Sequence, residues 1–295
     1  MSAAVQIQKR RQRTFAQRLR TRRSLAALVV GLLVIAALWQ IVAMMYARAL
    51  ENPHYVMPDL GYAFTVSLPQ ISDFYSGVFG GTPPGSGGSR SPGMGLLALV
   101  EHSAVSLCRV AAGLALGTLI GVVAGMLMQS IRPLREAFLG ISNFFRMMPL
   151  LAMGPLFTLW LGATDLASIV FVTFAVAPIM LIATLGAIRD LDTDHINYAR
   201  TLGATPAEVR RRIILPAIVP GIIGPLNVAA VLAWSVLLSS ELWGIQNGIG
   251  WMMGQSLQFS QMGSVLIIAL GFIVLTFATV QALAALSRRL TRWAE

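Results

Sequence analysis

Residues 166–188 read LASIVFVTFAVAPIMLIATLGAI, a run without a charged side chain. A helix needs about 20 apolar residues to cross a bilayer, because it rises about 1.5 Å per residue and the hydrocarbon core is about 30 Å thick. A polar stretch, 189–216, follows at once, and a second uncharged run occupies Ile218–Ser240. Long apolar runs that alternate with short polar segments predict a membrane protein built from several transmembrane helices.

The composition of the whole chain supports this class. Of its 295 residues, 56% are hydrophobic and only 12% are charged, and the mean hydropathy is +0.72. A soluble domain of this length has too small an interior to bury so much apolar surface. The net charge of +10 could indicate a nucleic-acid partner, but the basic residues stand at the ends of apolar runs, where they act as topology signals. We therefore expect contact with membrane lipid and none with nucleic acid.

Six runs are long enough to be membrane spans. They are Leu25–Tyr46, Leu107–Met128, Phe144–Leu161, Leu166–Ile188, Ile218–Ser240 and Met262–Leu286. The third has Arg146 and Pro149 near its start, and the segment before it, Pro133–Ser142, is expected to lie along the membrane surface. The predicted fold is an all-α polytopic membrane protein with about six transmembrane helices.

The arginines predict how these helices are oriented, because cytoplasmic loops carry an excess of basic residues. A cytoplasmic N-terminus places most arginines inside and leaves only Arg48, Arg90 and Arg109 outside. The first apolar run is too long for a cleavable signal peptide and is expected to be retained. The predicted organisation is a basic cytoplasmic segment 1–24, a first helix 25–46, an external loop 47–105, a membrane core 106–286 and a cytoplasmic C-terminus 287–295.

Glycines cluster in two segments of this predicted organisation. The external loop contains the run GGTPPGSGGS at 80–89, which lacks the lysine that a phosphate-binding Walker A loop needs and is interpreted as a flexible linker. The second span carries a glycine at every fourth position, which puts the four on one helix face and predicts close approach of another helix. These residues are Gly113, Gly117, Gly121 and Gly125.

The polar stretch 189–216 has the signals of two short helices joined by a turn. Asp192, Thr193 and Asp194 offer N-cap oxygens for a first helix that runs to about Leu202. Gly203 can end it in the left-handed conformation. Thr205 and Glu208 then form the pattern of a capping box around Pro206 at the first position of a second helix. The stretch predicts a rigid helix–turn–helix at the cytoplasmic membrane surface, suited to fit a groove on a partner.

This stretch also resembles the EAA motif of binding-protein-dependent ABC transporter permeases. The motif reads E-A-A, three residues, G, nine residues and I-x-L-P. The residues that match it are Ala199, Gly203, Ile213, Leu215 and Pro216, with Asn197 at the place of the usual Glu and Tyr198 at that of the first Ala. The resemblance implies that 189–216 is the coupling segment that docks on the ATPase.

Further stretches resemble one branch of that family, the permeases for nitrate, sulfonate, taurine and bicarbonate. The third predicted span fits this branch best, with the pattern R-x-x-P-x-x-A-x-x-P-L-F-x-L-W-x-G at 146–162. The resemblance runs from about Ser106 to Trp293 and leaves out the N-terminal third. It implies the fold of a type I importer permease, with 106–286 as the permease core.

The resemblance implies a function and a set of partners as well. The expected function is the membrane permease subunit of an ATP-driven importer for a small anion, in the inner membrane. The expected partners are cytoplasmic ABC ATPase subunits, an external substrate-binding protein and a second copy of the chain, with ATP hydrolysis on the separate subunits. Glu208 belongs with the coupling residues named above.

Five residues outside the motif are candidates for the transport pathway or for contact with the binding protein. They are Arg109, Trp234, Ser239, Ser240 and Glu241. Arg109, near the outer end of its span, could attract an anion, anchor the helix at the interface or pair with Glu101. Trp234 could instead be a packing residue, and Glu241 could be exposed at the outer surface.

Two other functional classes make different demands on the sequence. A secondary transporter or channel that works without an ATPase would hold ionisable groups at mid-membrane, and the predicted spans place almost none there. An intramembrane enzyme would need a catalytic motif such as H-E-x-x-H or G-x-S-x-G, which the chain lacks. The three histidines, His54, His102 and His195, lie far apart without metal-ligand spacing, so no cofactor, metal or catalytic residue is expected.

Overall fold

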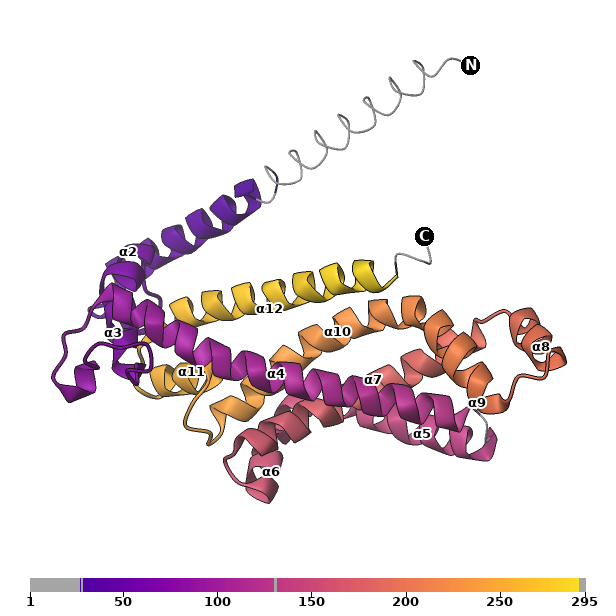
Figure 1. The fold of residues 1–295 in the computed structure, drawn as a ribbon. Helices are drawn as coiled ribbons and strands as arrows, with labels where there is room; N and C mark the ends of the chain where they lie inside the picture. Colours follow the sequence, from indigo (N-terminus) through magenta and orange to yellow (C-terminus); the bar gives the residue numbers. More distant parts are fainter. Residues whose placement is uncertain (1–26, 28, 130–131, 292–295) are drawn as a thin grey trace, which may run out of the picture.

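The computed structural model describes residues 27, 29–129 and 132–291, and in these ranges it consists of helices and their connections without a strand (Figure 1). The basic segment predicted at 1–24 lies outside the described residues. The shorter helical elements on either side of the long ones are η1 Pro53–Tyr55, α2 Leu60–Tyr62, η2 Ala63–Ser67, α3 Leu68–Ile71, η3 Ser72–Phe74, η4 Pro84–Ser86, α8 Thr193–Thr201, α9 Pro206–Val209, η5 Arg210–Ile214 and α11 Ile249–Gln258.

Five of the described helical stretches are long and apolar enough to cross a membrane. They are an N-terminal helix Val29–Ala49, α4 Pro92–Met128, α7 Asp165–Arg189, the stretch Pro206–Leu242 that ends in α10 Leu215–Leu242, and α12 Met262–Leu290. Helices α4, α7, α10 and α12 extend along a common direction, and the N-terminal helix diverges from them (Figure 1). The all-α polytopic fold predicted from the sequence is confirmed.

The single span predicted at Phe144–Leu161 is wrong, because two helices share this region. Helix α5, Arg132–Met147, ends before Pro149, and α6, Leu150–Leu161, begins after it. Proline disfavours the helical conformation of the residue before it and has no N–H for a helix hydrogen bond. With 12 residues, α6 is too short to cross a bilayer alone. Helices α5 and α6 follow one another back along α7 (Figure 1).

The connection before the second long helix, predicted as an external loop at 47–105, is also shorter than expected. Helix α4 begins at Pro92, fifteen residues before the predicted start at Leu107 (107 − 92 = 15). The Ser91 hydroxyl caps it by accepting from the Met94 N–H at 3.2 Å, and proline suits the first helical position. Before this, the short elements η1 to η3 fold into a compact unit, in which Ile71 packs in a cluster with Ile268 of α12.

The glycine face of α4 packs against α7, as the sequence predicts. A Cβ atom added at Gly113 would lie 2.6 Å from the Cβ of Val172, and one at Gly117 would lie 2.7 Å from the Cβ of Val176. These distances are shorter than real side chains allow, so only glycine permits the helices to approach this closely. The main core lies beside this seam, where α4, α7 and α10 meet around the fully buried Trp234.

Candidate functional site

The polar segment between α7 and α10 forms the predicted hairpin of two capped helices. Helix α8 begins after Asp192, whose side chain accepts from the Asp194 N–H at 3.0 Å. It ends at Gly203, whose φ of +86° lies in the left-handed region where glycine has no steric penalty. The N–H of Gly203 donates to the Arg200 carbonyl at 3.0 Å, and that of Ala204 donates to Ala199 at 3.1 Å. This is the Schellman arrangement, which satisfies the last carbonyls of α8.

Helix α9 starts with the capping box predicted from the sequence. The Thr205 hydroxyl accepts from the Glu208 N–H at 3.3 Å, and the Glu208 carboxylate accepts from the Thr205 N–H at 2.9 Å. Pro206 occupies the first helical position. Since both helices are capped where they face each other, the turn between them has a defined shape rather than a range of shapes.

One side of the hairpin is anchored on the membrane core. Val209 and Ile214 are buried with Ile188 of α7 and Ile218 of α10, and Ala199 packs against this cluster. Three of the predicted coupling residues are half-buried in the structure, and four are exposed. The half-buried ones are Ala199, Ile213 and Leu215, and the exposed ones are Asn197, Gly203, Glu208 and Pro216.

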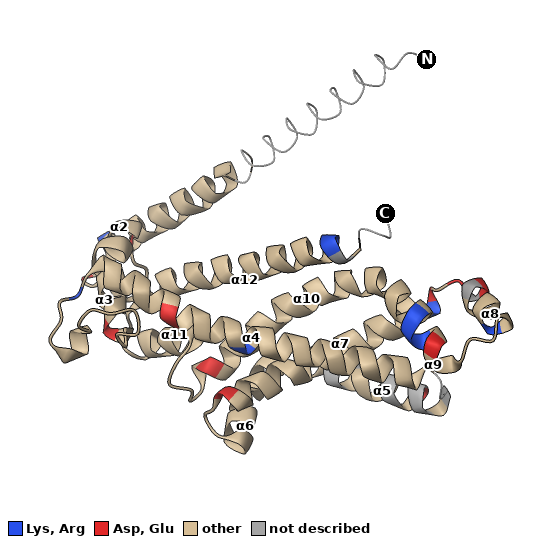
Figure 2. Ribbon diagram, in the orientation of Figure 1, with Lys and Arg blue, Asp and Glu red and all other residues tan. Residues whose placement is uncertain are grey.

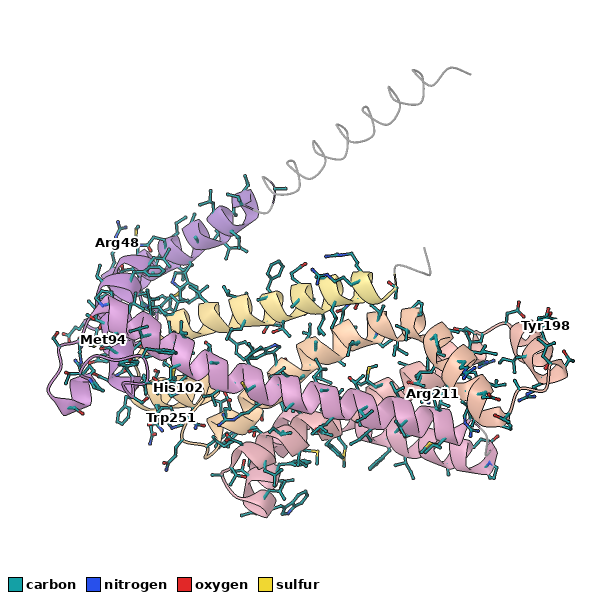
Figure 3. All side chains as sticks on the ribbon, viewed as in Figure 1. Arg48, Met94, His102, Tyr198, Arg211 and Trp251 are labelled. Carbon is teal, nitrogen blue, oxygen red and sulfur yellow. The ribbon has the colours of Figure 1, made fainter. Side chains whose placement is uncertain are left out.

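The other side of the hairpin is open and carries large apolar side chains. Tyr198 is 68% exposed and Leu202 is 72% exposed. Beside Leu202 is a hollow of about 320 Å³, which Gly203 and Glu208 also line. Charged residues gather at this end of the molecule (Figure 2), and Figure 3 shows Tyr198 and Arg211 there. The hairpin therefore presents an apolar tip, a small hollow and a basic flank on a fixed backbone.

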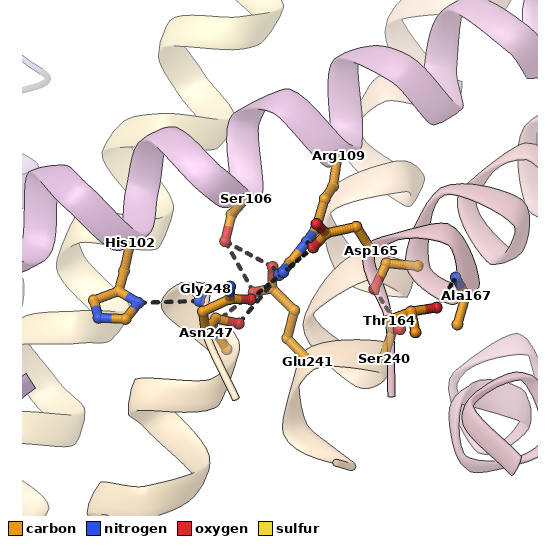
Figure 4. A network of polar contacts seen from close by, with 12 residues as sticks. His102, Ser106, Arg109, Thr164, Asp165, Ala167, Ser240, Glu241, Asn247 and Gly248 are labelled. Carbon is orange, nitrogen blue, oxygen red and sulfur yellow. Dashed lines mark hydrogen bonds and ion pairs between the residues drawn. The ribbon is translucent and has the colours of Figure 1, made fainter. Parts of the chain in front are cut away.

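A second constellation is a buried charge cluster between α4, α7 and α10 (Figure 4). The Arg109 guanidinium of α4 donates to Glu241 of α10 at 2.6 Å and to Asp165 of α7 at 2.8 Å. It also donates to the backbone carbonyl of Asn247 at 3.1 Å and to the Asn247 side chain. The side chains of Arg109 and Glu241 are 2% and 0% exposed, whereas that of Asp165 is 67% exposed. One cation thus ties three long helices and a loop together.

Glu241 also holds the start of α11. Its carboxylate accepts from the Gly250 N–H at 2.8 Å and from the Ser106 hydroxyl at 2.8 Å. The adjacent N–H groups are satisfied by α4, because Ile249 donates to Ser106 at 2.9 Å and Gly248 donates to His102 at 3.0 Å. Helix N-termini favour a negative charge, so this carboxylate serves both the arginine and α11.

The glycines of the sequence Gly248-Ile249-Gly250 make room for the carboxylate. Gly248 has a φ of +101°, and a Cβ at Gly250 would lie 2.7 Å from the Cβ of Glu241. The sequence pattern of Glu241 followed by these glycines was therefore a signal for the cluster. The sequence carries no such signal for Asp165 or Asn247, and for His102 it shows only that metal-ligand spacing is lacking.

The structure corrects the expected surroundings of two candidates. Arg109 lies in the middle of α4 rather than near its end, and it does not pair with Glu101, which instead accepts from the Ser76 N–H at 3.2 Å. Glu241 is not exposed at an outer surface, because its exposed fraction is 0%. Roles of these residues in the pathway or in binding-protein contact stay predictions.

The other three candidates lie inside the subunit. Trp234 is fully buried and donates from Nε1 to the Thr279 hydroxyl at 3.2 Å. Ser240 shares a hydrogen bond of 2.8 Å with Ser168 of α7, and Ser239 donates to the Leu151 carbonyl of α6. In the described ranges, no three His, Cys, Asp or Glu side chains come together as a metal site.

These features define a multi-pass membrane protein with a capped hairpin exposed between two of its long helices. Residues 117–292 match the family described as the binding-protein-dependent transport system inner membrane component. The chain belongs to this family of ABC transporter permeases and is a multi-pass inner membrane protein.

Relatives in the same family show what the chain is similar to. A probable ABC transporter permease protein of Brucella abortus (strain 2308) is 32% identical over 67% of this chain and 79% of its own length. The taurine transport system permease protein TauC of Escherichia coli (strain K12) is 29% identical over 66% of this chain and 71% of its own. The putative aliphatic sulfonates transport permease protein SsuC of Bacillus subtilis (strain 168) is 31% identical over the same shares.

A solved structure shows the same fold. The inward-facing MetNI methionine ABC transporter matches with a TM-score of 0.58 and 23% identity over 70% of this chain and 99% of that chain. At this level of identity the match establishes the arrangement of helices alone. The prediction of a type I importer permease fold is confirmed.

Proposed function

We propose that this chain is the permease subunit of an ATP-driven importer for a small anion such as a sulfonate, taurine or nitrate. Two copies would form the membrane pathway, an external binding protein would deliver the substrate, and separate ATPase subunits would drive alternating access. The substrate class is supported by the relatives named for taurine and aliphatic sulfonates transport. The proposal makes ATP hydrolysis the work of the partner subunit.

The observation that carries this proposal is the hairpin of α8 and α9. Both of its helices are capped at the turn, its base is packed on α7 and α10, and its apolar tip is exposed. An exposed Tyr198 on a rigid turn is a typical anchor for a pocket on a partner, because tyrosine is enriched among the residues that carry most of the binding energy at protein interfaces. The exposed Leu202 adds apolar surface to this contact. A rigid turn also transmits displacement of the partner to α7 and α10 without bending.

The function of the hairpin can be tested in the assembled importer. The chain is purified with its co-purifying ATPase, reconstituted in proteoliposomes with the binding protein, and assayed for uptake and ATP hydrolysis. We expect Tyr198→Ala together with Leu202→Glu to abolish uptake and to release the ATPase. Tyr55→Ala is the matched control, because Tyr55 is 60% exposed but lies in the unit before α4.

Two results would contradict the proposal. Normal coupling of ATP hydrolysis to uptake in the hairpin variant would remove the docking role from α8 and α9. Uptake by proteoliposomes that contain this chain without any ATPase would support a secondary transporter or channel instead.

A further inference from the structure

An apolar groove of about 750 Å³ runs between α4, α10 and α12. Its walls are residues between 107 and 122 of α4, Leu226 of α10 and residues between 275 and 286 of α12, and threonine hydroxyls are the only polar side-chain atoms among them. Thr279 is hydrogen-bonded to Trp234 and to the Leu275 carbonyl. The buried hydroxyl oxygen of Thr118 has no partner in the described part of the chain.

The dimensions of the groove suit one extended hydrocarbon chain. Its α12 wall covers residues 275–286, which is about 16 Å at about 1.5 Å per residue and close to half of a hydrocarbon core about 30 Å thick. One leaflet is half of this hydrocarbon core, and a single acyl chain spans one leaflet, so the length of the groove matches that of an acyl chain.

A positive charge lies at one end of the groove. The groove-lining residues Ala282 and Leu286 are four apart on α12, and Arg289 follows three positions later on the same helix face. Arg288 and Arg289 are exposed, and neither forms an ion pair within the described ranges. The arginines appear as the blue band at the C-terminal end of α12 (Figure 2). Arg288 is turned about 100° away from Arg289 around the helix.

We propose that the groove is a binding site for an anionic phospholipid, with one acyl chain between α4 and α12 and the phosphate on Arg289. Arginine binds phosphate with several donors at once, and an arginine at a helix end reaches the headgroup region. The site concerns the membrane core alone and is independent of the proposed transport function.

Native mass spectrometry of the full-length chain in detergent tests the charge at this site. Phosphatidylglycerol and phosphatidylcholine with the same acyl chains are added in turn, and bound lipid is counted. We expect phosphatidylglycerol to bind more tightly than phosphatidylcholine. Arg289→Gln should weaken the binding of phosphatidylglycerol about fivefold, which corresponds to the typical contribution of one arginine near a membrane surface. Arg288→Gln is the matched control and should leave binding unchanged. Equal binding of the two lipids, or an equal loss in both variants, would overturn the proposal.

The groove itself is tested by Ala282→Trp, which fills it from the α12 side. We expect this variant to lose bound phosphatidylglycerol while its melting temperature stays near that of the parent chain. Retention of the lipid in a folded Ala282→Trp variant would overturn the assignment. A disulfide between two copies of Ala282→Cys, made in a Cys108→Ser background, would also overturn it, because a second copy would then occupy the groove. Where the tryptophan variant does not fold, the comparison of Arg288→Gln with Arg289→Gln decides.

Discussion

Replacing Arg109 by methionine is expected to destabilise the chain strongly. The substitution removes the cation that lies 2.6 Å from the fully buried Glu241 carboxylate. The carboxylate would keep only the Ser106 hydroxyl and the Gly250 N–H. Leaving one partner of a buried ion pair without its counter-charge costs about 3–5 kcal/mol, so Arg109→Met should lower the free energy of unfolding by this amount.

The converse change should cost less, because the surroundings of the two charges differ. In Glu241→Gln the guanidinium still has Asp165, whose side chain is 67% exposed, and Asn247. We expect a loss of about 2 kcal/mol, which is typical for a hydrogen bond between charged groups. The double variant Arg109→Met/Glu241→Gln should cost less than the two single losses added together, because neither charge remains buried alone.

Thermal unfolding of the full-length chain in detergent, followed by tryptophan fluorescence, measures these differences. At about 2–4 °C per kcal/mol, Arg109→Met should lower the melting temperature by about 6–20 °C. Arg90→Met is the control. The side chains of Arg90 and its partner Asp73 are 58% and 38% exposed, so their ion pair should contribute at most about 1 kcal/mol. Equal shifts in Arg109→Met and Arg90→Met, or full additivity in the double variant, would refute the reasoning.

Two further predictions concern the helix seam and the hairpin. Gly117→Ala should lower the free energy of unfolding by about 1–3 kcal/mol, because its Cβ would lie 2.7 Å from that of Val176. The control Gly186→Ala has nothing within 4 Å of its Cβ and should raise the free energy of unfolding by about 0.5–1 kcal/mol. Equal shifts of the melting temperature in both variants would contradict the close packing of α4 on α7. Thr205→Ala should cost about 1 kcal/mol of local stability, because the N–H of Glu208 loses its acceptor. Hydrogen exchange of the α9 amides should therefore become about fivefold faster. Unchanged exchange would show that the Thr205 cap does not stabilise α9.

The hairpin was predictable almost residue by residue, because its signals are local. The caps at Asp192 and Thr205, the left-handed Gly203 and the capping box with Glu208 each depend on neighbours within a few positions. Which side of the hairpin is exposed was not predictable, since it depends on the packing of Val209 and Ile214 against α7 and α10.

The boundaries of the helices were less predictable. Apolar length alone predicted a continuous span over Phe144–Leu161, where Pro149 divides α5 from α6. The same criterion set the start of the second span at Leu107, whereas the cap at Ser91 starts α4 at Pro92. In both places a local backbone preference outweighed the average hydropathy of the window.

By itself, the sequence determined the membrane class, the glycine seam and the hairpin, because hydrophobicity, small size and capping are properties of single residues or close neighbours. Only the tertiary structure decided the partners of Arg109, since Asp165, Glu241 and Asn247 are separated from it by 56 to 138 positions. A buried charge must find a counter-charge, but the chain pattern alone does not say which of the available carboxylates the packed helices bring within reach.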